Sequence, residues 1–224
     1  MRFYPVYFLF FMAFLLLAGP AAGADPWRAF MGARMAGEAG DSVFAGRFAP
    51  QWERVRRDEQ QNPVFPPGGK ARFPAPYAYF WNNLYPSLSA MNRLDLLRAV
   101  SGFINVQMGG KLDKVSYGMG EYFASPREFL RNHGGDCEDF AICKYFLLRS
   151  LGWASQKLRL LVVEIPSLKR WHALLAAEIS GTVYIVDNNF RPRDLALPAE
   201  KVKGFFLLHY AFNEDGAWRY EQGR

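Results

Sequence analysis

Apolar residues recur every three or four positions along several stretches of the chain, a spacing typical of helices that bury one face. Helices are predicted on this pattern over residues 50–61, 88–104 and 137–151, with a short one starting at Pro126. Prolines and glycines crowd residues 62–76, which predicts a long irregular connection after the first helix. The aromatic stretch 77–81 is predicted to be extended or to pack on the core.

The pattern changes after residue 157, where short runs of β-branched, aromatic and aliphatic residues replace the helical spacing. Strands are predicted over residues 158–165, 171–179, 182–188 and 205–212. Ser180 and Gly181 separate two of these strands and fit a two-residue hairpin turn. Helices followed along the chain by an antiparallel sheet indicate an α+β fold.

The start of the helix 137–151 brings reactive groups together. Asp136 is the expected N-cap, and Cys137 falls in the first turn, where free backbone N–H groups and the helix dipole favour an anion. A thiolate nucleophile gains from that position, and the same N–H groups can polarise a carbonyl oxygen under attack. The alternative is a buried structural cysteine beside an acidic surface cap, and this segment alone leaves both interpretations open.

The predicted hairpin can place an imidazole beside a carboxylate. If residues 180–181 form a two-residue turn, His172 lies opposite Asn189, and Asp187 lies two positions away on the same face. Taken singly, His172 is more simply a hydrogen-bonded, partly buried histidine, and Asp187 a carboxylate at a strand end. The two interpretations weaken when the residues are considered together, because the chain has only three histidines.

Cysteine, histidine and aspartate in this order along the chain are typical of a papain-like or transglutaminase-like site. In such a site His172 would deprotonate the Cys137 thiol, and Asp187 would fix the imidazole tautomer. The other two histidines are weaker candidates. His133 precedes helix-breaking glycines, and His209 lies in a late apolar strand without an evident acidic partner.

The N-terminus has the pattern of a secretory signal peptide: an arginine, an apolar run over residues 6–18 and the cleavage motif Ala22-Gly23-Ala24. We therefore expect residues 1–24 to be a signal peptide, 25–49 a flexible arm and 50–224 a single domain. An uncleaved membrane anchor is the alternative, although the apolar run is short for a span.

Cysteine content and charge narrow the possible functions further. Exported proteins usually pair their cysteines. Cys137 and Cys143, however, lie six positions apart on one helix, roughly 9 Å, which exceeds disulfide reach. Both thiols are therefore expected to be free, with Cys143 packed in the core. The net charge of +6 is dispersed along the chain, which indicates a solvated surface and no nucleic-acid partner.

The run Gly-Asp-Cys-Glu-Asp-Phe-Ala-Ile-Cys-Lys-Tyr-Phe at 135–146 resembles the signature of the bacterial transglutaminase-like cysteine proteinases, the LapG-type periplasmic proteases. Residues 122–130, 158–160 and 186–188 fit the same family, as does His172. The resemblance covers most of the chain from residue 50 to about residue 212.

This resemblance implies a papain/transglutaminase-like fold, with the catalytic cysteine at a helix N-terminus packed on an antiparallel sheet. It implies the triad Cys137, His172 and Asp187. It also implies a Ca²⁺ site with oxygen ligands, since carboxylates suit calcium and a cation would offset their effect on the thiol pKa. These predicted ligands are Asp136, Glu138 and Asp139.

The oxyanion donor is less defined than the triad. The backbone N–H of Cys137 is the first candidate, and the side chains of Asn105 and Gln107 are further candidates.

The activity implied by the resemblance is limited proteolysis in the periplasm. The expected substrate is a large repeat-containing surface adhesin, cut at a di-alanine site in its N-terminal region, which releases the adhesin and promotes biofilm dispersal. The expected partner is an inner-membrane receptor that senses cyclic di-GMP and sequesters the protease.

Two alternatives remain open. A transglutaminase-fold amidase or acyltransferase would use the same three residues on another amide. A non-catalytic binding module would use calcium only to stiffen residues 136–139.

Overall fold

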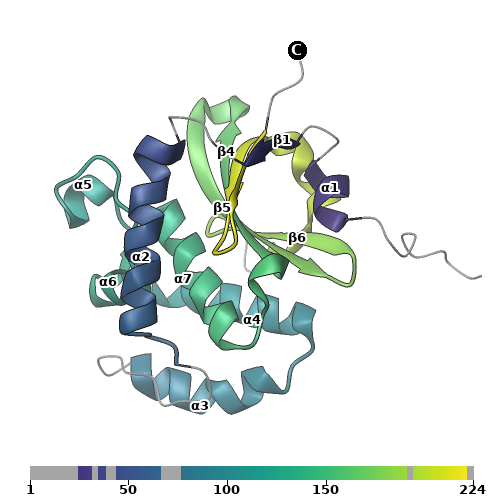
Figure 1. The fold of residues 1–224 in the computed structure, drawn as a ribbon. Coiled ribbons are helices and arrows are strands. Elements are labelled where there is room, and N and C mark those ends of the chain that lie inside the picture. Colours follow the sequence, from purple (N-terminus) through teal and green to yellow (C-terminus); the bar gives the residue numbers. More distant parts are fainter. Residues whose placement is uncertain (1–24, 32–34, 39–43, 67–76, 191–193, 221–224) are drawn as a thin grey trace, which may run out of the picture.

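The computed structural model of the 224-residue chain describes residues 25–31, 35–38, 44–66, 77–190 and 194–220. The predicted signal peptide lies outside these residues. Most helices gather on one side of a curved sheet, which is the α+β arrangement predicted from the sequence (Figure 1). Among the described residues, no helix combines the length and the apolar character needed to cross a membrane.

The sheet has seven strands in the order β1-β9-β8-β4-β5-β6-β7, and every neighbouring pair is antiparallel. The strands are β1 Met35–Glu38, β4 Leu158–Ile165, β5 Arg170–Ile179, β6 Thr182–Val186, β7 Leu197–Pro198, β8 Leu207–Phe212 and β9 Ala217–Tyr220. The predicted hairpin register is confirmed, because Ile179 pairs with Thr182 and the ladder runs to Leu175 opposite Val186. Ser180 and Gly181 both have positive φ, as this turn requires.

The helices agree with the sequence pattern in the middle of the chain and differ from it at two places. They are α1 Pro26–Met31, α2 Ala49–Gln61, α3 Tyr77–Ser89, α4 Arg93–Gln107, α5 Asp113–Ser116, α6 Pro126–Arg131 and α7 Cys137–Ser150. A π-helical turn, η1 Phe44–Phe48, precedes α2, and the short 3₁₀ helices are η2 Ser155–Lys157, η3 Pro166–Leu168, η5 Ala199–Lys201 and η6 Lys203–Phe205.

Both differences concern the segment before α4. The stretch 77–81 forms the first turns of α3 in place of an extended segment. The helix predicted to begin at residue 88 begins at Arg93, because Asn92 caps it by accepting a hydrogen bond from the Asp95 N–H at 3.0 Å.

Helix α7 is the centre of the helical layer and is enclosed nearly all round. It packs on β5, α4 and α6, and most of its residues are buried. Burial on nearly every side is expected for a helix in a core. Shortening a buried side chain here, such as Ile142 to alanine, would cost about 2–5 kcal/mol. The surroundings of α7 therefore fix the direction of its N-terminal turn, which carries Cys137.

The opposite face of the sheet is covered by the described parts of residues 25–49, the segment predicted to be a flexible arm. Helix α1 packs on it through Trp27, which is 5% exposed and donates from Nε1 to the Gln156 carbonyl at 3.0 Å. The Arg159 guanidinium lies 4.4 Å from the Trp27 ring and 3.8 Å from the Trp218 ring. Strand β1 pairs with β9. The described parts of residues 25–49 thus belong to the fold, and the prediction of a flexible arm needs correction.

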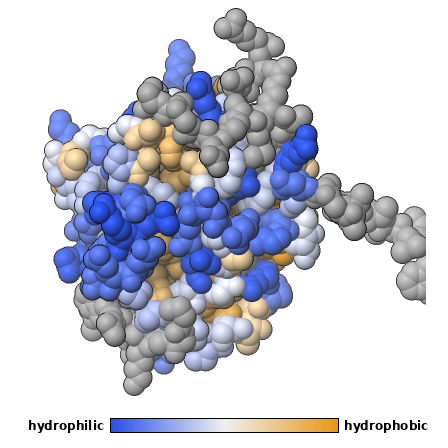
Figure 2. All heavy atoms as spheres, viewed as in Figure 1, coloured by the Kyte–Doolittle hydropathy of each residue, from blue (hydrophilic) through white to orange (hydrophobic). Residues whose placement is uncertain are grey.

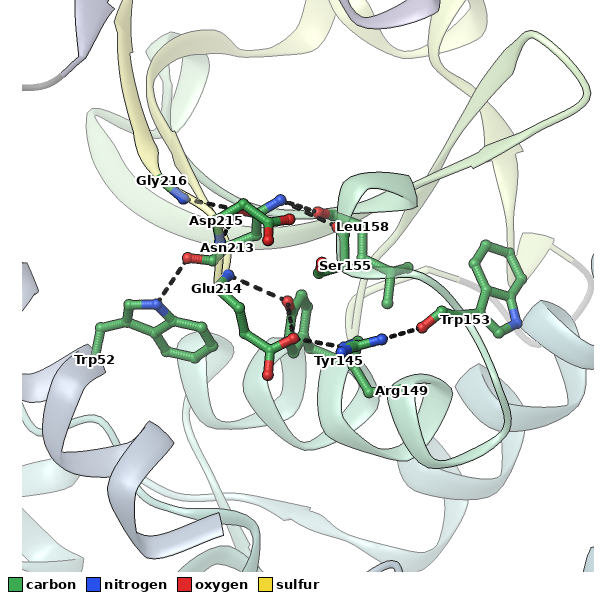
Figure 3. A network of polar contacts seen from close by, with 10 residues as sticks. All are labelled: Trp52, Tyr145, Arg149, Trp153, Ser155, Leu158, Asn213, Glu214, Asp215 and Gly216. Atoms are coloured by element: carbon green, nitrogen blue, oxygen red, sulfur yellow. Dashed lines mark hydrogen bonds and ion pairs between the residues drawn. The ribbon is translucent and has the colours of Figure 1, made fainter. Parts of the chain in front are cut away.

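A polar network ties α2 and α7 to the turn between β8 and β9 (Figure 3). Asn213 is the centre of this network. Its side-chain Nδ2 donates to the carbonyls of Ser155 and Leu158 at 3.0 and 3.1 Å, and its backbone carbonyl accepts from Trp52 Nε1 at 3.0 Å. Glu214 accepts from Arg149 Nε at 2.5 Å. The network fixes one face of α2, while hydrophilic side chains cover the outward face of this helix (Figure 2).

Candidate active site

A cavity of about 740 Å³ opens at the N-terminus of α7. Its walls come from α7, from strands β4, β5 and β8, from η1, from the segment after β6 and from the loop on either side of α5. The polar residues that line it around the thiol are Asp136, Cys137, Glu138, His172, Asn188 and Asn189. Buried apolar side chains such as Phe123 and Ile142 also line it.

Two glycines bring the chain sharply into α7 and so present Cys137 to this cavity. Gly134 and Gly135 form β3, a two-residue parallel pair with β2 (Gly109–Gly110). Gly134 has a φ of 137°, and a Cβ there would lie 1.8 Å from the Gly109 carbonyl oxygen. A Cβ on Gly135 would lie 2.0 Å from Asp139 Oδ2. The close approach of these segments therefore requires glycine at both positions.

The Cys137 thiol lies between a carboxylate and a backbone N–H of β5. Its Sγ donates to Glu138 Oε2 at 3.2 Å and accepts from the Ala173 N–H at 3.4 Å. Burial raises the pKa of the thiol, and the negative charges of Glu138 and Asp136 raise it further, whereas the Ala173 N–H acts in the opposite direction. The thiol is therefore protonated in this state, and ionisation needs a base and relief from the neighbouring charge.

His172, which lines the cavity with this thiol, hydrogen-bonds to Asp187. His172 Nε2 is 2.9 Å from Asp187 Oδ1, and the two side chains are buried. Asn189 donates from its backbone N–H to Asp187 Oδ1 at 2.9 Å. Because Ala173 follows His172 on β5 and contacts Sγ, the structure brings together the three residues that the sequence singled out.

Asn105 hydrogen-bonds to Asp187 and is not among the described residues that line the cavity. Its Nδ2 donates to the Asp187 carbonyl at 3.0 Å. Neither Asn105 nor Gln107, the other side chain considered as an oxyanion donor, lines the cavity among the described residues. The backbone N–H of Cys137 at the start of α7 remains the donor that the fold presents there.

Three carboxylates next to the thiol form a cluster that fits a divalent cation. Oxygens of Asp113, Asp136 and Glu138 lie within 4.8 Å of one another. Burial raises the pKa of Asp113 to about 6, of Asp136 to about 8 and of Glu138 to about 7, and neighbouring carboxylates add to each rise. Asp113 Oδ1 and Asp136 Oδ1 are buried without a hydrogen-bond partner. Unpaired buried oxygens with mutual repulsion are what a calcium ion would satisfy.

This cluster differs from the predicted ligand set in one member. Asp139 is fully buried, and its Oδ1 accepts from the Ala124 N–H at 2.7 Å, so it fastens the preceding loop to α7 and lies outside the cluster. Asp113, from α5, takes its place. Asp136 occupies the N-cap position as predicted, but its side chain makes no capping hydrogen bond.

The remaining histidines and the second cysteine lie outside this group. His133 is exposed, has a φ of 57° and ends the segment after α6. His209 has an acidic neighbour that the sequence pattern does not reveal, since its Nε2 is 3.5 Å from Glu164 Oε2. Cys143 is free and fully buried, and Cys137 is also free, as predicted.

Comparisons with known proteins point to one family. Residues 84–218 match the family model of the bacterial transglutaminase-like cysteine proteinase BTLCP. No curated protein sequence matches. The calcium-bound structure of Legionella pneumophila LapG is 28% identical with a TM-score of 0.57, covering 77% of this chain and 90% of that one. The EGTA-treated structure of the same protein is 27% identical with a TM-score of 0.57, covering 76% and 86%. The predicted transglutaminase-like fold is thereby confirmed.

Proposed function

The chain belongs to the bacterial transglutaminase-like cysteine proteinases, and we propose that it is a calcium-dependent periplasmic cysteine endopeptidase. One observation carries the proposal. The thiol at the start of α7 contacts β5 at Ala173, directly after a histidine whose ring is hydrogen-bonded to a carboxylate, and the thiol and the histidine line one cavity. We assign Cys137 as nucleophile, His172 as general base and acid, and Asp187 as the residue that orients the imidazole.

The proposed reaction begins with proton transfer from the Cys137 thiol to His172 Nδ1, because Nε2 is engaged by Asp187. The sulfur then attacks the peptide carbonyl, and the Cys137 N–H at the helix terminus stabilises the resulting oxyanion. His172 gives its proton to the leaving amine, and a thioester remains on the sulfur. Water, deprotonated by His172, hydrolyses this thioester and releases the carboxylate product, which restores the thiol.

We assign Asp113, Asp136 and Glu138 to hold the calcium ion. When bound there, calcium would neutralise carboxylate charge beside the sulfur. Glu138 links the thiol to the proposed calcium site. Its carboxylate accepts a hydrogen bond from the Cys137 thiol in this structure and also belongs to the acidic cluster. A Glu138 side chain turned toward a cation would leave the thiol free to donate to His172.

The proposed substrate is the N-terminal region of a large repeat-containing surface adhesin, cut once at a di-alanine site. Cleavage would release the adhesin and promote biofilm dispersal. An inner-membrane receptor that senses cyclic di-GMP is the proposed partner that sequesters the protease. The support for the substrate, the partner and the periplasmic location is the family resemblance together with the signal-peptide pattern of residues 1–24.

The test is cleavage of such an adhesin fragment by residues 25–224, followed by gel and intact mass. Parallel reactions contain calcium, a calcium chelator, Cys137→Ala and Cys143→Ala. The Cys143 variant is the matched control, because it removes the other thiol, which is buried in the core away from the cavity.

We expect a single cut with the parent protein in calcium and with Cys143→Ala, and none with chelator or with Cys137→Ala. Cleavage that survives Cys137→Ala would refute the nucleophile assignment. Incorporation of an added amine in place of hydrolysis would indicate the transglutaminase-fold acyltransferase instead.

A further inference from the structure

The geometry around His172 Nε2 involves a second side chain besides Asp187. Asn189 lines the cavity, and its side-chain nitrogen Nδ2 lies 3.4 Å from His172 Nε2. The Asn189 backbone N–H also donates to the same Asp187 oxygen that contacts the ring. One residue thus touches both members of the His–Asp pair.

Proton placement determines which end of the Asn189 amide can face the ring. If Nδ1 receives the thiol proton, Nε2 must already carry its own proton, which points toward Asp187 Oδ1 at 2.9 Å. An Nε2–H group repels the NH₂ end of an amide and attracts its oxygen. Rotation about the last side-chain bond of Asn189 replaces the Nδ2 that faces the ring in this structure with Oδ1, without moving the rest of the residue.

Exposure supports a role at the ring over a role in packing. His172 is 4% exposed and Asp187 is 8% exposed, whereas Asn189 is exposed to solvent. Asn189 thus lies on the solvent side of a buried charge-bearing pair. A polar group in that place can share the ring proton and keep the two side chains oriented toward each other. It contributes little to the hydrophobic core.

We propose that Asn189 is a positioning residue for His172: its side-chain oxygen shares the Nε2–H proton with Asp187, and its backbone N–H holds the Asp187 carboxylate. The inference rests on the proposed function. It implies that the ring has two acceptors, so a carboxylate moved from position 187 to position 189 still reaches Nε2.

The first test compares kcat and KM for adhesin cleavage by the parent protein and by Asn189→Leu, which keeps the side-chain size and removes the acceptor. We expect kcat to fall about tenfold and KM to change less than twofold. The melting temperature checks that the variant is folded. A kcat within twofold of the parent value would overturn the proposal.

The second test is a rescue. Asp187→Asn should lower kcat at least 100-fold, because the ring loses its carboxylate and its preferred tautomer. The kcat of the double variant Asp187→Asn/Asn189→Asp should be at least tenfold higher than that of Asp187→Asn. A structural role for Asn189 predicts no recovery, and a double variant no better than Asp187→Asn would refute the shared acceptor.

The rate at which iodoacetamide alkylates Cys137 is measured on the same variants. This rate reports histidine-assisted ionisation of the thiol without any peptide substrate. If the adhesin is not cleaved but alkylation follows the order parent, double variant, Asp187→Asn, the substrate assignment fails and the role of Asn189 stands. If alkylation is equal in all three, the role of Asn189 is refuted.

Discussion

Lys144 offers a sharp test of how α7 is buried. It is 1% exposed, and its Nζ lies 5.6 Å from the centre of the Phe140 ring. Burial lowers the pKa of the Lys144 amine from 10.5 to about 7, although the Asp187 carboxylate acts in the opposite direction. We predict that Lys144→Met, which keeps an unbranched side chain of similar length, stabilises the protein at neutral pH.

The magnitude follows from the difference between the folded and unfolded states. An unfolded lysine binds a proton throughout the neutral range, whereas the buried Lys144 gives its proton up near pH 7. The buried amine therefore does not reduce the free energy of unfolding above about pH 10.5, and the reduction grows as the pH falls toward 7. At about 1.4 kcal/mol per pH unit, the buried amine costs about 4 kcal/mol at pH 7 and about 2 kcal/mol at pH 9.

The assay is guanidinium unfolding of the parent protein and Lys144→Met at pH 7 and pH 9. The advantage of the variant should shrink by about half between the two pH values. Lys201→Met, on an exposed 3₁₀ turn, is the control and should stay within about 0.5 kcal/mol of the parent. A difference in unfolding free energy between the variant and the parent that is the same at both pH values would refute a lowered pKa at Lys144.

Three further predictions concern other parts of the molecule. Burial raises the pKa of Glu59 from 4.5 to about 7, so its contribution to stability is lost as the pH rises through that interval. The free energy of unfolding of Glu59→Gln, relative to that of the parent, should rise by about 3 kcal/mol from pH 5 to pH 8. A difference that is the same at both pH values would contradict this. Asn213→Ala should lose about 3 kcal/mol in a denaturant titration, because several buried hydrogen bonds disappear; the exposed Asp215→Ala control should lose under about 0.5 kcal/mol. Calcium at 100 times its Kd should add about 2.7 kcal/mol and raise Tm by about 5–10 °C, and Asp113→Asn should at least halve that rise.

Much of the site could be predicted because its parts are local in sequence. The helix start at Cys137 is specified by two adjacent glycines and an apolar run. The relation of His172 to Asp187 follows from the parity of a two-residue hairpin, which fixes the face of every strand residue. Short-range geometry determines both features, so pattern alone was sufficient.

The remaining features depend on contacts between segments far apart in the sequence. Asp113 joins the acidic cluster from a four-residue helix, and no sequence spacing relates it to Asp136. Asp139 shares the sequence context of Glu138, but its place one residue further along the helix turns it toward Ala124. Strand β1 has four residues and exists only by pairing with β9.

The central claim is that Cys137 is a thiol activated by His172 and relieved of its neighbouring carboxylates by calcium. The most direct measurement is the site and rate of alkylation by iodoacetamide, read by peptide mass for both cysteines, with calcium and with chelator, in the parent protein and in His172→Ala. Cys143, fully buried, is the internal reference.

We predict modification at Cys137 alone, faster in calcium than in chelator, and slowed at least tenfold in His172→Ala under both conditions. Equal rates in the parent and in His172→Ala would contradict activation by the histidine. A rate that calcium leaves unchanged would contradict the link through Glu138.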